Sequence, residues 1–430
     1  MNTTLKSMLV AAAALTAVSS YAQDKATLDL LVKKGLITAE ERAKTLDEAS
    51  KARAASGLNK VFVKEDNTKR LTFGGRVQTQ YESIAAETTN NSGTVSQATD
   101  VSQAFMRRLY LGLQADMGDG LSGEIVYNFA DDTLDKAIWT ADTAYGKFIL
   151  GYQKVQWGLE ENTSSSKLYT IERSAANRFW NESVSSTASS YGRLGFGARH
   201  TGLHYSNRSV IDTAQTLDYG FSVANAIQGE TAIASNDMAV FANIIYSYKV
   251  SDTHRYSFGL NYGTARDTRT AAGTGTGAGV NDATISGFNP YIKSQIDNLV
   301  VQAEYIMTTN EAVTGSTPNA VERKPEGYNV IVAYKLTDQL EAVVRYSDLD
   351  TDGHGAGFNG LYRDATTASV YNKYDSVYVG LNYYFVDHNA KIGVGYEQAN
   401  ASELMSAMGG TIGTGKAKAD IFRVQAQVLF

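Results

Sequence analysis

The sequence of 430 residues contains no cysteine, only 3 prolines and only 5 histidines. Without cysteine the protein has neither disulfide bonds nor thiolate chemistry. After the first twenty residues no apolar run approaches the roughly 20 residues that a membrane-spanning helix needs. His200 and His204 would share one face of a strand, but no carboxylate lies beside them at metal-ligand spacing, and nothing in the sequence pairs a nucleophile with an oriented base. We therefore expect no metal, no cofactor and no enzymatic activity. The histidines are His200, His204, His254, His354 and His388.

The formal net charge is −6, so a nucleic-acid partner has no basic surface to bind. Glycine and tyrosine are abundant instead, with 38 and 26 residues. Together with the missing helical periodicity, this composition favours strands and turns.

The N-terminal residues have the pattern of a secretory signal. Lys6 supplies a positive charge, residues 9–18 are apolar, and Ser20, Tyr21 and Ala22 form a small-x-small cleavage site. We expect residues 1–22 to be a signal peptide. Residues 23–69 are expected to form a short periplasmic helical segment followed by a linker, because Leu28, Leu31 and Val32 have helical spacing.

From residue 70 onward the hydrophobic period changes to two. Near the start of this region, one face of the predicted strand is apolar and the other is polar. The apolar face consists of Leu71, Phe73, Val77 and Tyr81, and the polar face of Arg76, Gln78 and Gln80. The same alternation recurs to the C-terminus, where Phe422, Val424, Val428 and Phe430 oppose Arg423, Gln425 and Gln427. A soluble β-sandwich would alternate in the same way.

Connection lengths separate these two folds. We expect sixteen strands, joined alternately by tight turns such as 117–120 and 145–146 and by long polar segments such as 82–103, 265–285, 350–373 and 399–419. Short turns at one end and long loops at the other are typical of outer-membrane barrels. Tyrosine and phenylalanine near the strand ends match the aromatic girdles of such barrels. The sequence therefore predicts an all-β protein of residues 70–430, a 16-stranded antiparallel transmembrane β-barrel in the outer membrane of a Gram-negative-type bacterium, in contact with outer-membrane lipid.

The longest interruption between predicted strands is residues 158–195. A segment of this length is usually functional or disordered. It carries four cations and four glutamates, together with Phe179 and Trp180. We expect it to fold into the bore as a constriction loop.

Several short motifs resemble the phosphate-selective porin O and P family. They are Gly151–Glu160 (GYQKVQWGLE), Ile171–Ser174 (IERS), Phe105–Gly112 (FMRRLYLG) and Gly75–Val77 (GRV). The resemblance covers about residues 71–430. It implies a homotrimer of sixteen-stranded channels that pass small anions through a constriction of arginine and lysine. The terminal Phe430 resembles the assembly signal of outer-membrane porins, which implies the outer-membrane barrel assembly machinery as a partner.

An anion filter needs fixed positive charge at a narrow point, and guanidinium suits phosphate because its planar fork donates two parallel hydrogen bonds. The candidate pore residues are Arg76, Arg107, Arg108, Lys154, Arg173, Arg178 and Arg193. Strand alternation places Arg107 and Lys154 on the apolar face, unless a bulge or a rim position turns them inward. The sequence leaves three functions open: passive diffusion of small hydrophilic solutes with a preference for anions such as phosphate, a non-selective porin, and a structural or adhesive barrel with a plugged bore.

Overall fold

The computed structural model describes residues 38, 40, 61–66, 69–182, 193–226, 238–267, 283–312, 321–363 and 369–430. The expected signal peptide and nearly all of the expected N-terminal helical segment lie outside these residues. Within the expected linker, Val61–Asp66 forms strand β1 and pairs with the start of β2.

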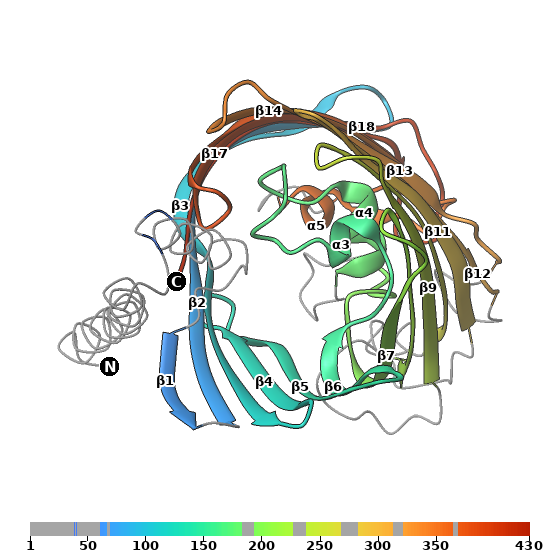
Figure 1. The fold of residues 1–430 in the computed structure, drawn as a ribbon. Coiled ribbons are helices and arrows are strands. Elements are labelled where there is room, and N and C mark those ends of the chain that lie inside the picture. The colour runs from blue at the N-terminus through green and yellow to red at the C-terminus, as the bar shows by residue number, and fades with distance from the viewer. Residues whose placement is uncertain are drawn as a thin grey trace.

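Most of the described chain forms one antiparallel sheet that closes on itself (Figure 1). Sixteen strands make the closed barrel, in which β18 pairs with β2 and β14 pairs directly with β16. Strands β1 and β15 are short additions to the edges of β2 and β16. The barrel and its strand number confirm the prediction. The barrel strands are β2 Lys69–Thr89, β3 Val95–Gly118, β4 Leu121–Asn128, β5 Thr133–Thr143, β6 Gly146–Lys154, β7 Arg199–Val210, β8 Gln215–Asn225, β9 Met238–Lys249, β10 His254–Asp267, β11 Ala283–Ile296, β12 Leu299–Asn310, β13 Glu326–Lys335, β14 Leu340–Asp350, β16 Val370–Val386, β17 Ala390–Met405 and β18 Lys416–Leu429.

The wall has an apolar exterior and a polar interior, which is the reverse of a soluble protein. Phe73 and Tyr81 on the outside of β2 are 44% and 41% exposed, whereas Gln78 and Gln80 between them are at most 1% exposed. Since lipid rather than water surrounds such a barrel, the exposed band of large apolar side chains is the surface that the bilayer covers. Every barrel strand pairs on both sides, so no backbone groups are left unsatisfied at an open edge.

Tight turns join the strands at one end of the barrel, as predicted. The turn between β3 and β4 contains Asp119 and Gly120 with positive φ angles of 52° and 76°. A Cβ atom on Gly120 would lie 2.1 Å from the Asp142 carbonyl oxygen, so this position requires glycine.

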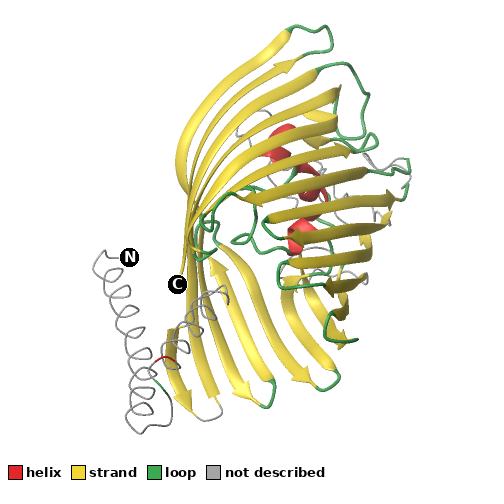
Figure 2. Cartoon of the chain, turned by 45° about the horizontal axis from the view of Figure 1, so that its top comes forward, coloured by secondary structure: helices red, strands yellow, loops and turns green. Residues whose placement is uncertain are grey.

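Two of the expected long external loops are shorter than predicted. Strands β2 and β3 continue to Thr89 and from Val95, so most of the expected loop 82–103 is strand. Strands β17 and β18 likewise extend into the expected loop 399–419. The polar residues that suggested loops lie instead on strands, which Figure 2 shows as unequal in length.

Two segments lie inside the barrel. The connection between β6 and β7 carries α3 (Leu159–Asn162) and α4 (Ala175–Asn181). The connection between β14 and β16 carries β15 (Ala356–Gly357) and α5 (Phe358–Tyr362), and α5 packs beside α4. Figure 1 shows all three helices within the ring of strands. No helix in the described part of the chain is both long and apolar enough to cross a membrane.

A hydrophobic core forms inside the barrel, where these segments meet the wall. Phe179 and Trp180 of α4 and Phe358 of α5 are fully buried in it. The wall contributes large side chains such as Ile285 and Tyr374 and also small ones, among them Ala399, Ala401, Ala417 and Ala419, which leave room for the two segments. The inner wall is thus polar as a whole but apolar where the helices lie.

Candidate functional site

The inserted segment begins at the end of β6, where Gly158 turns the chain inward with a φ of 81°. The carboxylate of Glu304, on the inner face of β12, accepts hydrogen bonds from the backbone N–H groups of Leu159 (2.8 Å) and Glu160 (3.1 Å). These are donors that a helix start leaves free. Glu304 therefore fixes α3 to the wall.

The second helix of the segment begins at Ser174. Its hydroxyl accepts a hydrogen bond from the Asn177 N–H and donates one to Glu160, 2.6 Å away. At the other end of α4, the Trp180 indole N–H donates to the Thr308 hydroxyl of β12 at 3.0 Å. The segment is consequently held by buried polar contacts as well as by the core.

Arg107 and Arg108 both point into the barrel, although they are adjacent on one strand. The register of β2 against β3 shifts here, because Gln78 faces Arg108 while Thr79 faces Met106. Arg107 is therefore the extra residue of a β-bulge, which turns its side chain inward. Alternation alone would have placed it on the lipid side.

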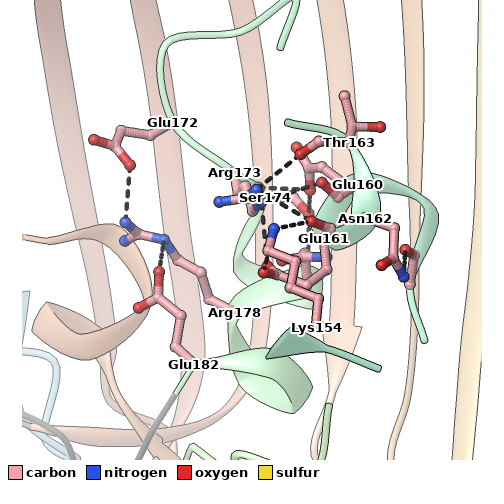
Figure 3. A network of polar contacts seen from close by, with 12 residues as sticks. Lys154, Glu160, Glu161, Asn162, Thr163, Glu172, Arg173, Ser174, Arg178 and Glu182 are labelled. Atoms are coloured by element: carbon pink, nitrogen blue, oxygen red, sulfur yellow. Dashed lines mark hydrogen bonds and ion pairs between the residues drawn. The ribbon is translucent and has the colours of Figure 1, made fainter. Parts of the chain in front are cut away.

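Lys154 is the last residue of β6 and contacts the inserted segment from there. Its Nζ atom lies 2.8 Å from the Glu161 carboxylate, which also pairs with the Arg173 guanidinium at 3.2 Å. Figure 3 shows these side chains together. Burial alone would raise the pKa of Glu161, but Arg173 and Lys154 outweigh burial and lower this pKa to about 2. Glu161 therefore stays ionised, and its contribution to stability is present above pH 4.5 and lost as the pH falls towards 2.

Glu172 occupies a similar position among arginines. Arg107 donates to it through Nε at 2.5 Å and Nη2 at 3.3 Å, and Arg178 donates through Nη2 at 3.1 Å. Burial would raise the pKa of Glu172, yet these guanidinium groups hold it well below its usual value. Arg178 also forms an ion pair with Glu182 (Figure 3). Glu182 in turn pairs with Arg193.

The candidate residues thus fall into two groups. Arg107, Lys154, Arg173, Arg178 and Arg193 each form an ion pair with a glutamate of the inserted segment. Arg76 and Arg108 have no ion pair within the described residues. The Arg76 guanidinium stacks 4.2 Å from the centre of the Tyr110 ring, and Arg108 donates to the Gln78 side-chain oxygen at 2.9 Å. Whether any of them acts on a solute stays a prediction.

Residues outside the predicted set complete the network. Arg345 of β14 is fully buried and bonds Glu397 (2.7 Å) and the backbone carbonyl of Glu172 (2.6 Å). Arg363, which follows α5, pairs with Glu182 at 2.8 Å and with Glu172 at 3.4 Å. We expected residues 350–373 to be an ordinary external loop and so missed Arg363. The available signal was Phe358, Leu361 and Tyr362, an apolar cluster that is out of place in a solvated loop.

The side of the barrel interior opposite the inserted helices is more open. We call the inner faces of β4 and β5, together with the halves of β6–β11 that lie next to the tight turns, the open wall. A cavity of about 460 Å³ lies against it, lined in part by Asp142, Lys147, Gln156 and Asn243. Carboxylates on this wall are matched by cations: Glu124 by Lys136, Asp142 by Lys147, and Asp218 by Arg208.

Three exposed cations of the barrel interior have no ion-pair partner among the described residues. They are Arg255 of β10, Lys293 of β11 and Lys167 of the inserted segment. Lys167 and Lys293 are near enough for their like charges to interact. In the part of the chain that the structure describes, no three acidic or histidine side chains gather as a metal site.

Comparisons with known proteins agree with this architecture. The family model described as phosphate-selective porin O and P matches residues 72–430. A comparison with curated proteins gives no match. The in-vitro folded outer membrane protein OmpT of Vibrio cholerae has 14% identity and a TM-score of 0.51, covering 86% of this chain and 99% of its own.

Two further solved structures share the fold. The trimer form of Vibrio cholerae OmpT has 13% identity and a TM-score of 0.50, with 85% of this chain and 100% of that chain covered. Salmonella typhi OmpF in complex with daunomycin has 16% identity and a TM-score of 0.51, with 86% and 100% covered. At these identities the likeness establishes the barrel fold.

Proposed function

The chain belongs to the phosphate-selective porin O and P family of outer-membrane porins, and from this premise we propose a channel for passive diffusion that favours small anions, such as phosphate, over cations. The family supports a water-filled path across the outer membrane. The preference for anions rests on the distribution of charge inside the barrel. The net charge of −6 over the whole chain does not oppose it, because charges far from the path are screened within about 10 Å at 0.1 M salt.

The observation that carries the proposal is an imbalance among the unpaired groups. Inside the barrel, Arg76, Arg108, Lys167, Arg255, Lys293 and Lys391 form no ion pair within the described residues. The inward carboxylates without an ion pair there are Glu304 and Glu341, and neighbouring donors satisfy both. Cations thus outnumber carboxylates among the groups whose charge is not already compensated.

The solute path should run along the open wall. The inserted segments and their hydrophobic core fill the opposite side of the interior, whereas the cavity at the open wall is lined by polar side chains. Arg255 and Lys293 lie on β10 and β11 of the open wall, and Lys167 is near enough to Lys293 for their charges to interact. An anion entering there would meet positive charge that no carboxylate neutralises.

The packed interior also favours a second candidate, a structural or adhesive barrel with a plugged bore. Two segments, rather than one, enter the barrel and share a hydrophobic core. A barrel of this kind would pass no measurable current. A non-selective porin would conduct without preferring anions.

We further propose that the protein is not an enzyme and assembles as a homotrimer in outer-membrane lipid, with the help of the barrel assembly machinery. The similarity to the trimer form of Vibrio cholerae OmpT supports the trimer. We also propose that residues 1–22 are a signal peptide, that 23–69 lie in the periplasm, and that 158–195 narrow the channel.

Single-channel recording in a planar bilayer tests the proposal. With a potassium chloride gradient across the bilayer, the reversal potential should have the sign of chloride preference. When phosphate replaces chloride in one chamber, the current carried by anions leaving that chamber should persist. A reversal potential of the opposite sign would contradict the anion preference, and the absence of any conductance would favour the plugged barrel.

A further inference from the structure

Four arginines from different parts of the chain share two glutamates. Arg107 belongs to β3, Arg178 to α4, Arg193 to the end of the inserted segment, and Arg363 follows α5. Glu172 binds the first two and lies 3.4 Å from the last. Glu182 binds Arg178 at 3.2 Å, Arg363 at 2.8 Å, and Arg193. We call these six residues the arginine cluster.

The arginine cluster has an excess of positive charge. It contains four guanidinium groups and two carboxylates, and within the described residues none of the six has an ion pair outside the cluster. Two positive charges therefore lack a counter-ion there. Because a buried uncompensated charge is unfavourable, an arrangement of this kind favours the entry of an anion.

Exposure increases from one side of the cluster to the other. The side chains of Arg178, Glu172 and Arg107 are 1%, 5% and 6% exposed. Those of Arg193, Glu182 and Arg363 are 14%, 19% and 38% exposed. Solvent and solutes can therefore reach the cluster at the edge where Glu182 bridges Arg193 and Arg363.

We propose that Glu182 is an internal ligand that a solute oxyanion displaces, so that Arg193 and Arg363 form an oxyanion-binding site at this edge. This inference rests on the proposed anion preference and adds a specific site to it. The planar fork of guanidinium binds two oxygens of a carboxylate or phosphate at once. Glu182 already presents such a carboxylate between the two arginines, so the geometry that an incoming oxyanion needs is in place.

The site draws on both inserted segments. Arg193 closes the first, and Arg363 comes from the second, beside α5. The Leu361 carbonyl oxygen accepts a hydrogen bond from Arg178 at 2.9 Å, which ties the second segment to the buried side of the cluster. Exchange of Glu182 for a solute would remove one ion pair of Arg178 but leave this hydrogen bond and the pairing of Glu172 with Arg107 and Arg178 in place.

Binding of inorganic phosphate to the detergent-solubilised protein, measured by isothermal titration calorimetry, provides the test. In Glu182→Gln the competing carboxylate is absent, so phosphate should bind several-fold more tightly than in the wild type. Arg363→Gln and Arg193→Gln should each weaken binding several-fold. Glu311→Gln removes the same charge from an exposed position outside the cluster and should leave binding unchanged.

The affinities of the variants for acetate should follow the same order as their affinities for phosphate, because a carboxylate binds the same guanidinium groups. Their affinities for chloride should not differ. Unchanged or weaker phosphate binding in Glu182→Gln, with native migration on an unheated gel, would overturn the inference. An equal response to chloride would also overturn it, by reducing the site to a general charge effect. Because calorimetry does not depend on current, these results stand apart from the sign of the reversal potential, which tests the proposed function.

Discussion

The two sides of the barrel interior handle charge differently. On the packed side, the buried side chains of Glu172 and Arg345 each lie against close ion-pair partners. On the open wall, Lys293 and Arg255 are exposed and have no ion-pair partner among the described residues. Burial explains the contrast, because a charge removed from water needs a partner whereas an exposed charge does not. Fully paired and buried arginines such as Arg107 and Arg178 are therefore poor candidates for selecting ions, and the exposed cations are better ones.

The largest expected effect comes from breaking the packed side at Glu172. Replacing Glu172 by glutamine leaves Arg107 and Arg178 without their shared carboxylate in a buried site. Removing one partner of a buried ion pair costs about 3–5 kcal/mol. The urea midpoint for release of the inserted segment should fall accordingly. Trp157 and Trp180 report this release by fluorescence, because both are fully buried in the core that the segment forms.

Glu124→Gln is the matched variant on the open wall, where the carboxylate pairs with Lys136 at 3.3 Å but remains partly exposed. Exposed pairs contribute about 0–1 kcal/mol, so the midpoint should scarcely move. If both variants shifted the midpoint equally, the contrast between the two sides would be wrong.

A smaller effect should follow from enlarging Gly327, on β13 under α4. A Cβ atom there would lie 2.8 Å from the Asp348 carbonyl oxygen and 3.2 Å from side-chain atoms of Ala176 and Trp180. Overpacking of this kind costs about 1–3 kcal/mol. Gly327→Val should therefore loosen α4 and raise the open-channel noise in single-channel recordings.

Gly259→Val provides the comparison on β10. The three atoms nearest to its added Cβ would all belong to the ring of Tyr291, a wall residue. Current noise should stay at the wild-type level. Equal noise in the two variants would show that α4 does not border the conducting path.

The period-two pattern sufficed to predict the barrel wall. Apolar residues such as Phe73 face the lipid, and polar residues such as Gln78 face the interior. Because successive residues of a strand point to opposite faces, the sequence alternates between the two kinds. The ends of the strands were less predictable. Polar residues such as Glu87 and Asp100 resemble loop residues, yet they lie on the outward extensions of β2 and β3.

The pairing within the site could not be read from the sequence. Alternation assigns Arg107 to the lipid side, and only the bulge in β3 explains its contact with Glu172. The contacts of Arg363 depend on α5 entering the barrel, which brings it beside Glu182, 181 residues earlier in the chain. Contacts over such distances follow from packing rather than from local spacing.

The smallest expected effect concerns ion choice at the open wall. Replacing Lys167, Lys293 and Arg255 together by glutamine should shift the reversal potential towards cation preference, because each replacement removes an uncompensated positive charge. A charge near the path contributes about 1 kcal/mol at contact in water and less at greater distance. Because salt screens this interaction, the shift should shrink as the ionic strength rises. The double replacement of Lys136 and Glu124 by glutamine removes a matched pair from the same wall and keeps the net charge, so it should not move the reversal potential. If the triple variant retained the wild-type selectivity while Arg108→Gln abolished it, the path would run past the buried arginines and the packed side would be the selective one.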